Sequence, residues 1–282
     1  MIILKKAFQI IGLFTIICFS FFITEQTVTV VKEQDPIMIE LESIKNKYYQ
    51  APVNAIIKGN TIIPGISGKE IDIDKSYSNI KKVGYFDIKL LKYKKVKPSI
   101  SLVHNQDKYI IQGNPIRNQV SLLFILDTND KVEQLNTIIK DTKVNYFITA
   151  DYLNNNLKTI KKLSTNKEIY NYGYSGNYTE SLLLFANNLI NHNANNKSIY
   201  CLTKEENENT LKTCNIVTNY VIKPNIITQK SPYNEIKNNL TSGSIILLDV
   251  NSQSLKELPS IINFINSKGY KIVTLSTLLS EE

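Results

Sequence analysis

The chain has 282 residues, of which 43% are hydrophobic, so it can bury the core of one domain of about 170 residues and of a smaller one. Its formal net charge of +8 comes almost entirely from lysine, because Arg117 is the only arginine. Base recognition relies on the arginine fork, so this charge argues against a nucleic-acid partner. A lysine-rich surface facing an anionic cell envelope and simple solubility are the two remaining interpretations.

The N-terminus carries a targeting signal. Lys5 and Lys6 precede an apolar run from Ala7 to Ile23, close to the lower limit of about 17 residues for a spanning helix. No Ala-x-Ala exit follows the run. We therefore expect a transmembrane signal-anchor at residues 1–24, a single-pass protein of the cell membrane and an extracytoplasmic body. A cleaved signal peptide is the alternative.

The next segment, residues 25–50, is polar, rich in Glu and Lys, and predicts a stalk. Residues 51–118 predict a small α+β region whose short segments are punctuated by Gly and Pro. Its expected strands are Pro52–Ile57, Thr61–Gly68, Glu70–Ile73, Tyr85–Tyr93 and Lys108–Gln112. Its one helix is expected at Asp74–Lys82, with Asp74 as N-cap and Gly84 as the stop.

Residues 119–282 alternate apolar strands with helices, which is typical of βαβ units. The alternation predicts an α/β fold, as either a parallel barrel or an open doubly wound sheet. Expected strands are Val120–Leu126, Val144–Thr149, Glu168–Tyr172, Ser198–Leu202, Asn219–Ile222, Ser244–Asp249 and Gly269–Ser276. Expected helices include Thr179–Asn191, Tyr233–Leu240 and Ser254–Lys268.

Two cysteines lie in this region. In an extracytoplasmic compartment Cys201 and Cys214 could form a disulfide, which would contribute about 3 kcal/mol in the chain-entropy model. Two separate buried thiols are the alternative.

Two stretches carry a resemblance. Val120–Leu279, with a C-terminal strand that ends at Asp249, resembles the polysaccharide deacetylase (NodB homology) family. Pro64–Ile73, with Ser76-Tyr77 and Gly84–Asp87, is similar to the N-terminal segment of sporulation-type, membrane-anchored deacetylase-like proteins of Gram-positive bacteria. The resemblance implies a distorted (β/α) barrel of NodB type at residues 119–282.

Active members of that family hydrolyse N-acetyl groups on glycans with a divalent metal, usually zinc, held by one Asp and two His. A neighbouring Asp acts as base and a further His as acid. Carried over by motif, the two carboxylate positions fall on Ile125 and Leu126, the two histidines on Tyr172 and Gly176, and the final histidine on Asp249. The resemblance therefore implies a degenerate member with no zinc cofactor.

The histidine count agrees with this expectation. The chain has only His104 and His192, and both are expected in loops rather than at strand ends.

Three carboxylates remain as catalytic candidates: Asp249, Asp127 and Asp130. All should project from carboxyl ends of strands, where (β/α) folds place their sites. Paired there, they could support glycoside hydrolysis or bind calcium. For Asp127 and Asp130, capping of the following helix is the alternative.

A polar aromatic cluster marks the position of the lost metal motif. Tyr172, Tyr174 and Asn171, together with Asp249, are candidate ligand-binding residues, because aromatic faces with amide and hydroxyl groups suit sugar rings. Alternatively, tyrosine only fills the volume of the lost metal centre.

The leading hypothesis is thus a membrane-anchored, catalytically inactive polysaccharide deacetylase-like protein that binds or organises cell-wall polysaccharide or peptidoglycan. The alternative is a carbohydrate-active hydrolase, of deacetylase or glycosidase type, with a rebuilt carboxylate site around Asp249. A third hypothesis is a structural partner of another envelope protein.

Overall fold

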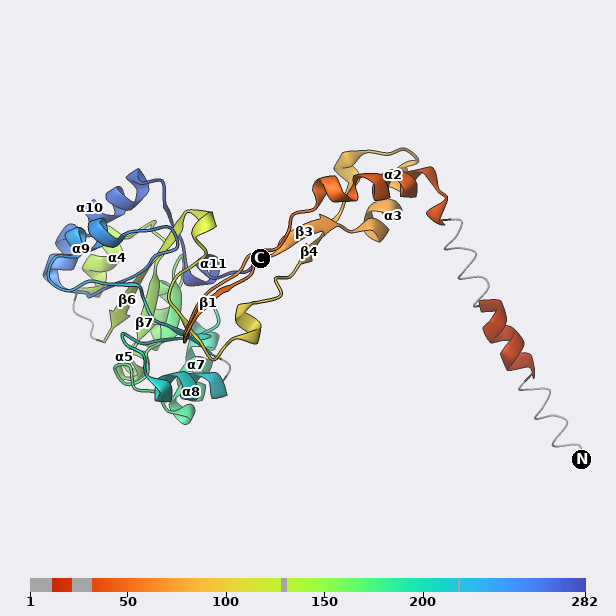
Figure 1. Ribbon diagram of the computed structural model, residues 1–282. Helices are drawn as coiled ribbons and strands as arrows, with labels where there is room; N and C mark the ends of the chain where they lie inside the picture. The colour runs from red at the N-terminus through yellow and green to blue at the C-terminus, as the bar shows by residue number, and fades with distance from the viewer. Residues whose placement is uncertain (1–11, 22–31, 128–130, 218) are drawn as a thin grey trace, which may run out of the picture. The chain divides into compact units, whose positions relative to one another are not determined.

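The computed structural model describes residues 12–21, 32–127, 131–217 and 219–282 (Figure 1). Its contacts divide the chain into two compact units. Unit 1 contains the described residues up to Ala51 together with Gly68–Val96, and unit 2 contains Pro52–Ser67 and Lys97–Glu282. This division cuts across the expected region 51–118, because its outer parts pack with the C-terminal body.

Unit 1 is a small α+β unit around Leu41, Ile71, Ile80 and Leu91. Its elements are α2 (Pro36–Ile44), η1 (Lys45–Tyr48), β3 (Gly68–Ile71), α3 (Ile73–Val83), η2 (Ile88–Leu90) and β4 (Tyr93–Val96). Strands β3 and β4 pair antiparallel.

Helix α3 starts two residues earlier than expected. Its N-cap is Asp72, whose carboxylate accepts the backbone N–H of Lys75 at 3.1 Å, and Asp74 lies inside the first turn. The expected cap at Asp74 is therefore wrong, because only Asp72 has the extended backbone that an N-cap requires. Gly84 ends the helix with φ 87° as predicted.

The expected extended segment Tyr85–Tyr93 is also wrong: η2 occupies its middle, and β4 begins only at Tyr93.

The predicted anchor at residues 1–24 falls largely outside the described residues, which cover only 12–21 of it. Those ten residues are helical. Within the described part of the chain, no helix is long and apolar enough to cross a membrane.

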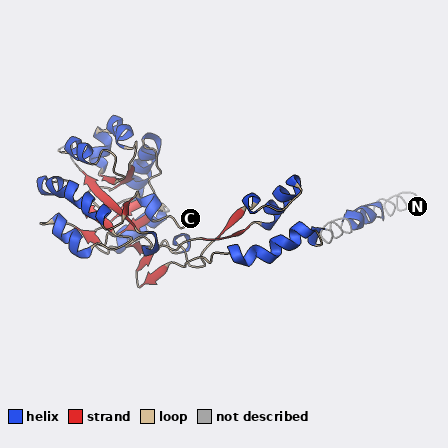
Figure 2. Ribbon diagram, turned by 90° about the horizontal axis from the view of Figure 1, so that it is seen from above, coloured by secondary structure: helices blue, strands red, loops and turns tan. Residues whose placement is uncertain are grey.

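Unit 2 alternates strands and helices, and Figure 2 shows its strands flanked by helices. The strands are β1 (Ile56–Lys58), β2 (Thr61–Ile63), β5 (Tyr109–Ile110), β6 (Gln119–Leu126), β7 (Asn145–Ile148), β8 (Glu168–Asn171), β9 (Tyr200–Leu202), β10 (Tyr220–Ile222), β11 (Ile226–Ile227), β12 (Ile245–Leu248) and β13 (Lys271–Ile272). The helices are α4 (Val132–Ile138), α5 (Ala150–Asn155), α6 (Leu157–Leu163), α7 (Glu180–Asn193), α8 (Glu208–Ile216), α9 (Pro232–Asn239), α10 (Ser252–Ser267) and α11 (Leu275–Leu278), with 3-10 turns at η3 (Leu102–His104) and η4 (Pro115–Arg117).

The strands of unit 2 form two sheets. One has the order β11-β12-β6-β7-β8, with β13 beside β6, and the other has the order β1-β2-β5-β10-β9. All pairs are parallel except β1 with β2. The expected α/β class is confirmed. Hydrogen bonding does not by itself close these sheets into one barrel, so the barrel stays a prediction.

Strand β6 shows how the core is divided. Successive side chains alternate between its two faces. Leu122, Phe124 and Leu126 pack in the cluster that also holds residues of α4, α9 and α10, which lie on one side of β6 and β7 (Figure 1). Leu123 packs in the second cluster, between the two sheets. A strand buried on both faces explains the continuous apolar run in the sequence.

Buried polar contacts fix the register. Asn145 on β7 donates to Ser121 Oγ at 2.7 Å and to the Leu122 carbonyl at 3.0 Å, and its Oδ1 accepts the Leu275 N–H at 2.8 Å. The last contact ties α11 to the sheet. The expected strand Gly269–Ser276 is therefore shorter than predicted, since only Lys271–Ile272 is extended and α11 follows.

Two more contacts join distant parts of unit 2. Gly243 has φ +86°, and a Cβ there would lie 2.2 Å from the Gly113 carbonyl oxygen. The Glu281 carboxylate accepts the backbone N–H groups of Gly65 at 2.8 Å and Leu102 at 3.1 Å. The segment that carries β1 and β2 is thereby attached to the body of the unit.

Candidate functional site

The candidate site is a cavity of about 380 Å³ at the carboxyl ends of the parallel strands. This volume lies within the usual range for small-molecule sites. We call it the strand-end cavity; its lining residues are Ile125, Asp127, Thr149, Tyr172, Ser175, Lys204, Asp249 and Val250. They come from the ends of five strands, β6, β7, β8, β9 and β12, which explains why residues far apart in sequence converge there.

Asp127 and Asp249 follow directly after β6 and β12, which pair in register through Phe124 and Leu248. The two carboxylates therefore project from adjacent strands. Both side chains are exposed, and neither makes a hydrogen bond or ion pair with another described residue. Asn251 caps α10, which leaves the carboxylate of Asp249 available to the cavity.

The capping interpretation fails for Asp127 as far as the described residues show. The N-cap of α4 is Lys131, which makes no side-chain cap. The third candidate carboxylate, Asp130, lies outside the described residues.

Tyr172 lies between the two sheets at the end of β8, where its N–H donates to the Ile148 carbonyl at 2.8 Å. Tyr172 is only 7% exposed, and it lines the cavity with no hydrogen bond from its hydroxyl to another described residue. Burial, followed by the charges of Asp249 and Asp127, raises the pKa of the Tyr172 phenol. The hydroxyl is thus neutral, belongs to a residue that lines the same cavity as both carboxylates, and can donate its proton to a ligand.

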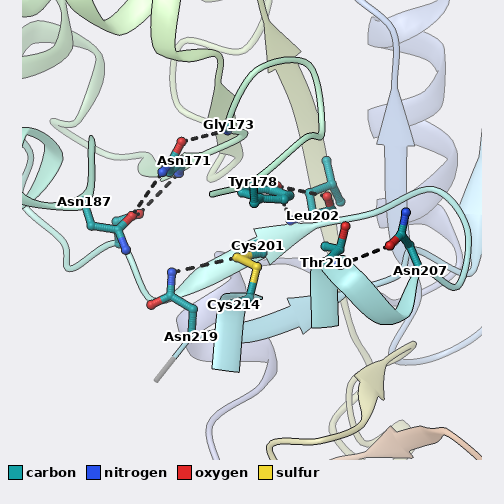
Figure 3. The surroundings of a disulfide bond; sticks show 11 residues. Asn171, Gly173, Tyr178, Asn187, Cys201, Leu202, Asn207, Thr210, Cys214 and Asn219 are labelled. Carbon is teal, nitrogen blue, oxygen red and sulfur yellow. Dashed lines mark hydrogen bonds between the residues drawn. A yellow bond between two sulfur atoms is a disulfide. The ribbon is translucent and has the colours of Figure 1, made fainter. Parts of the chain in front are cut away.

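The loop after β8 is built by tight backbone turns. Gly173, Ser175 and Gly176 all have positive φ, a conformation that favours glycine, and glycine occupies two of the three positions. Asn171 is buried under this loop: its Oδ1 accepts the Gly173 N–H at 2.8 Å, and its Nδ2 lies 3.5 Å from Asn187 Oδ1 (Figure 3). Asn171 therefore holds the loop and does not line the cavity.

Tyr174, the remaining residue of the predicted cluster, is 54% exposed and is not among the lining residues. Of the four predicted ligand-binding residues, the structure brings only Tyr172 and Asp249 into the cavity.

The wall beside β9 is braced by two contacts (Figure 3). The Tyr178 hydroxyl donates to the Leu202 carbonyl at 3.0 Å and accepts the Leu202 N–H at 2.9 Å. Cys201 and Cys214, left open in the sequence as a disulfide or two thiols, are joined by a disulfide that links β9 to α8. Lys204 follows directly on this braced segment.

Lys204 and Thr149 were not singled out in the sequence. Both follow strands, which is the only signal that could have found them. Thr149 also caps α5, since its hydroxyl accepts the Tyr152 N–H at 3.3 Å.

The lining residues do not fit the zinc set of an active deacetylase. Ile125 lines the cavity where a carboxylate would be needed, and Leu126 points into the core on the other face. A Cβ at Gly176 would lie 3.1 Å from the Tyr172 hydroxyl, so the tyrosine ring fills the volume a second side chain would need.

Neither histidine reaches the cavity. His104 ends η3, and His192, in the last turn of α7, contacts the Asn188 carbonyl at 2.7 Å. Among the residues that the structure describes, no group of three or more His, Cys, Asp or Glu could hold a metal ion.

Several known proteins resemble this chain in sequence or in fold. No family model matches the chain. The uncharacterized protein YlxY of Bacillus subtilis (strain 168) is 26% identical over an alignment of 285 residues, gaps included, that covers 91% of this chain and 88% of that protein. BA3943 of Bacillus anthracis, described as a pseudoenzyme of carbohydrate esterase family 4 (CE4), has a TM-score of 0.66 at 24% identity, covering 88% of this chain and 96% of that one.

A catalytic protein shares the fold over a smaller part of the chain. The peptidoglycan N-acetylglucosamine deacetylase Bc1960 has a TM-score of 0.54 at 20% identity, and covers 62% of this chain and 94% of its own. The resemblance stated from the sequence is confirmed, and the chain has the α/β fold of the carbohydrate esterase family 4 deacetylases and of a pseudoenzyme of that family.

Proposed function

We propose that the chain is a catalytically inactive deacetylase-like protein that binds a cell-wall glycan in the strand-end cavity. The observation that carries this proposal is the cavity itself, which Asp127, Asp249 and Tyr172 line with polar groups that no hydrogen bond or ion pair joins to another described residue. Carboxylates and a phenol are suitable partners for sugar hydroxyls. The absence of a fitting zinc set among the lining residues supports binding over hydrolysis.

The same proposal includes membrane attachment. It rests on the sequence, in which Lys5 and Lys6 precede the apolar run Ala7–Ile23. An anchored, extracytoplasmic body would face peptidoglycan directly.

The test is co-sedimentation of the purified full chain with insoluble peptidoglycan, together with its metal content and deacetylase activity. We expect binding without stoichiometric zinc and without activity. Tyr172→Ala should reduce binding, whereas Asp107→Asn should not, since Asp107 precedes β5 at the opposite end of the parallel strands. Stoichiometric zinc with chelator-sensitive activity would refute the proposal.

A second candidate function is glycoside hydrolysis with Asp127 and Asp249 as the carboxylate pair. It is favoured by their position on adjacent strands of one cavity. If it is correct, the chain releases reducing ends from wall glycan, and Asp249→Asn lowers that rate at least about 100-fold. An unchanged rate in this variant would exclude the pair.

A further inference from the structure

The strand-end cavity carries an imbalance of charge. Asp127 and Asp249 each bring a carboxylate, and Lys204 is the one cationic side chain among the lining residues. Two carboxylates and one ammonium group give the cavity a formal charge of −1. Within the described chain, neither carboxylate forms an ion pair with Lys204 or with any other cation. The cavity can therefore accept one more positive charge.

A second observation points to a ligand. Tyr172 is only 7% exposed, yet it lines the cavity, and no hydrogen bond joins its hydroxyl to another described residue. A hydroxyl that opens on the cavity can both donate to a bound ligand and accept from it. The hydroxyl also lies in the field of both carboxylates, because their charges act on it directly. A cationic donor placed between these groups would satisfy all three.

We propose that the strand-end cavity recognises the protonated primary amine of a de-N-acetylated amino sugar. An ammonium has three N–H donors, which suit two carboxylates and the phenol oxygen. A neutral acetamide would offer one N–H donor and a carbonyl acceptor, and it would leave the two like charges uncompensated. The chemistry of the cavity therefore discriminates against the N-acetylated sugar.

This inference rests on the proposed function and names the form of glycan bound. Deacetylation converts an amide and water into a primary amine and acetate, and the amine takes up a proton. The ligand would thus be the product of a deacetylation reaction carried out by another protein. The chain would mark or occupy glycan that has already been deacetylated.

The experiment is isothermal titration of the full chain with two oligosaccharides of equal length, the glucosamine tetramer and the N-acetylglucosamine tetramer, at about pH 6, where an alkyl amine is protonated. We expect the glucosamine tetramer to bind at least tenfold more tightly. The formal net charge of +8 repels a polycationic oligomer, so non-specific attraction cannot produce this preference.

Two isosteric variants locate the binding. Asp249→Asn should weaken binding of the glucosamine tetramer about tenfold and leave the N-acetylated one within twofold. The control Asp107→Asn removes the same charge outside the cavity and should change neither. Both variants keep the shape of the side chain, and thermal melting checks that they fold.

The outcomes separate the two proposals. Equal affinity for both tetramers, or a preference for the N-acetylated one, overturns the amine inference and leaves glycan binding intact. Tight amine binding that Asp249→Asn and Asp127→Asn both leave unchanged also overturns it, because the amine would then bind elsewhere. Binding of neither tetramer, together with failure to sediment with peptidoglycan, refutes the proposed function and this inference with it.

Discussion

Removing the disulfide between Cys201 and Cys214 should lower stability by a predictable amount. Both cysteines are fully buried, and the bond joins β9 to α8 next to the cavity wall. The sequence separation of 13 residues closes a short loop in the unfolded chain. In the chain-entropy model such a loop reduces the entropy of the unfolded state by about 10 cal/mol/K.

That entropy corresponds to about 3 kcal/mol at 25 °C. For a unit of about 200 residues, each kcal/mol shifts Tm by about 2–4 °C, so the expected loss is about 6–12 °C. The assay is thermal melting of the wild type with and without reductant, and of the variant Cys201→Ala/Cys214→Ala. The remaining cysteine, Cys18, is exposed and free, and serves as the internal control.

The double variant should melt near the reduced wild type, slightly lower because two buried sulfur atoms are lost. It should not respond to reductant. A reduced wild type that melts within about 2 °C of the oxidised protein would refute the reasoning. In that case the loop would already be ordered by the Tyr178 contacts to Leu202, and the cross-link would add nothing.

Three further predictions concern the core. Burial raises the pKa of seven tyrosines, so as the pH rises the unfolded chain loses these phenol protons at a lower pH than the folded chain does. The free energy of unfolding should therefore be constant below about pH 10 and fall above it. Tyrosinate absorbance should rise together with unfolding. The seven tyrosines are Tyr109, Tyr146, Tyr152, Tyr170, Tyr172, Tyr178 and Tyr200. Unchanged urea midpoints between about pH 9 and 11 would contradict this expectation. Gly243→Ala should lower the free energy of unfolding by more than about 2 kcal/mol, because its Cβ would lie 2.2 Å from a backbone carbonyl oxygen. The control Gly59→Ala, with open space around it, should lower it by about 1 kcal/mol. Similar urea midpoints for the two variants would be inconsistent with this packing. Asn145→Ala should cost about 2–4 kcal/mol in urea unfolding, since the Leu275 N–H loses its partner inside the core, and a loss below 1 kcal/mol would argue against that contact.

The alternation of strands and helices could be predicted from the sequence because it is a local signal. The run Gln119–Leu126 is apolar at nearly every position, as a strand buried on both faces must be. Once such strands are known to be parallel, their carboxyl ends share an edge. That rule is sufficient to bring Asp127, Tyr172 and Asp249 to one place.

The remaining features depend on contacts that no local pattern encodes. Asn171 and Tyr174 belong to the same polar cluster as Tyr172, but only the positive φ angles of the loop decide which side chain enters the cavity. Nothing in the sequence distinguishes Lys204 from the other lysines of the chain. Only its place after β9 brings it to the cavity. The division into units depends on the pairing of β2 with β5, which lie on either side of the 29 residues Gly68–Val96 of unit 1.

The contacts of Glu281 have a consequence for how the chain is made. Its carboxylate binds Gly65 and Leu102, which precede it by 216 and 179 residues. At 5–20 residues per second, a ribosome needs about 10–40 s to supply this partner after Gly65 has emerged. Strand β2 can pair with β5 as soon as Tyr109–Ile110 has emerged, but the other edge of β5 stays unpaired until β10 is made, and the Glu281 contacts form only when synthesis is nearly finished. Such a chain depends on protection from aggregation while it is being translated.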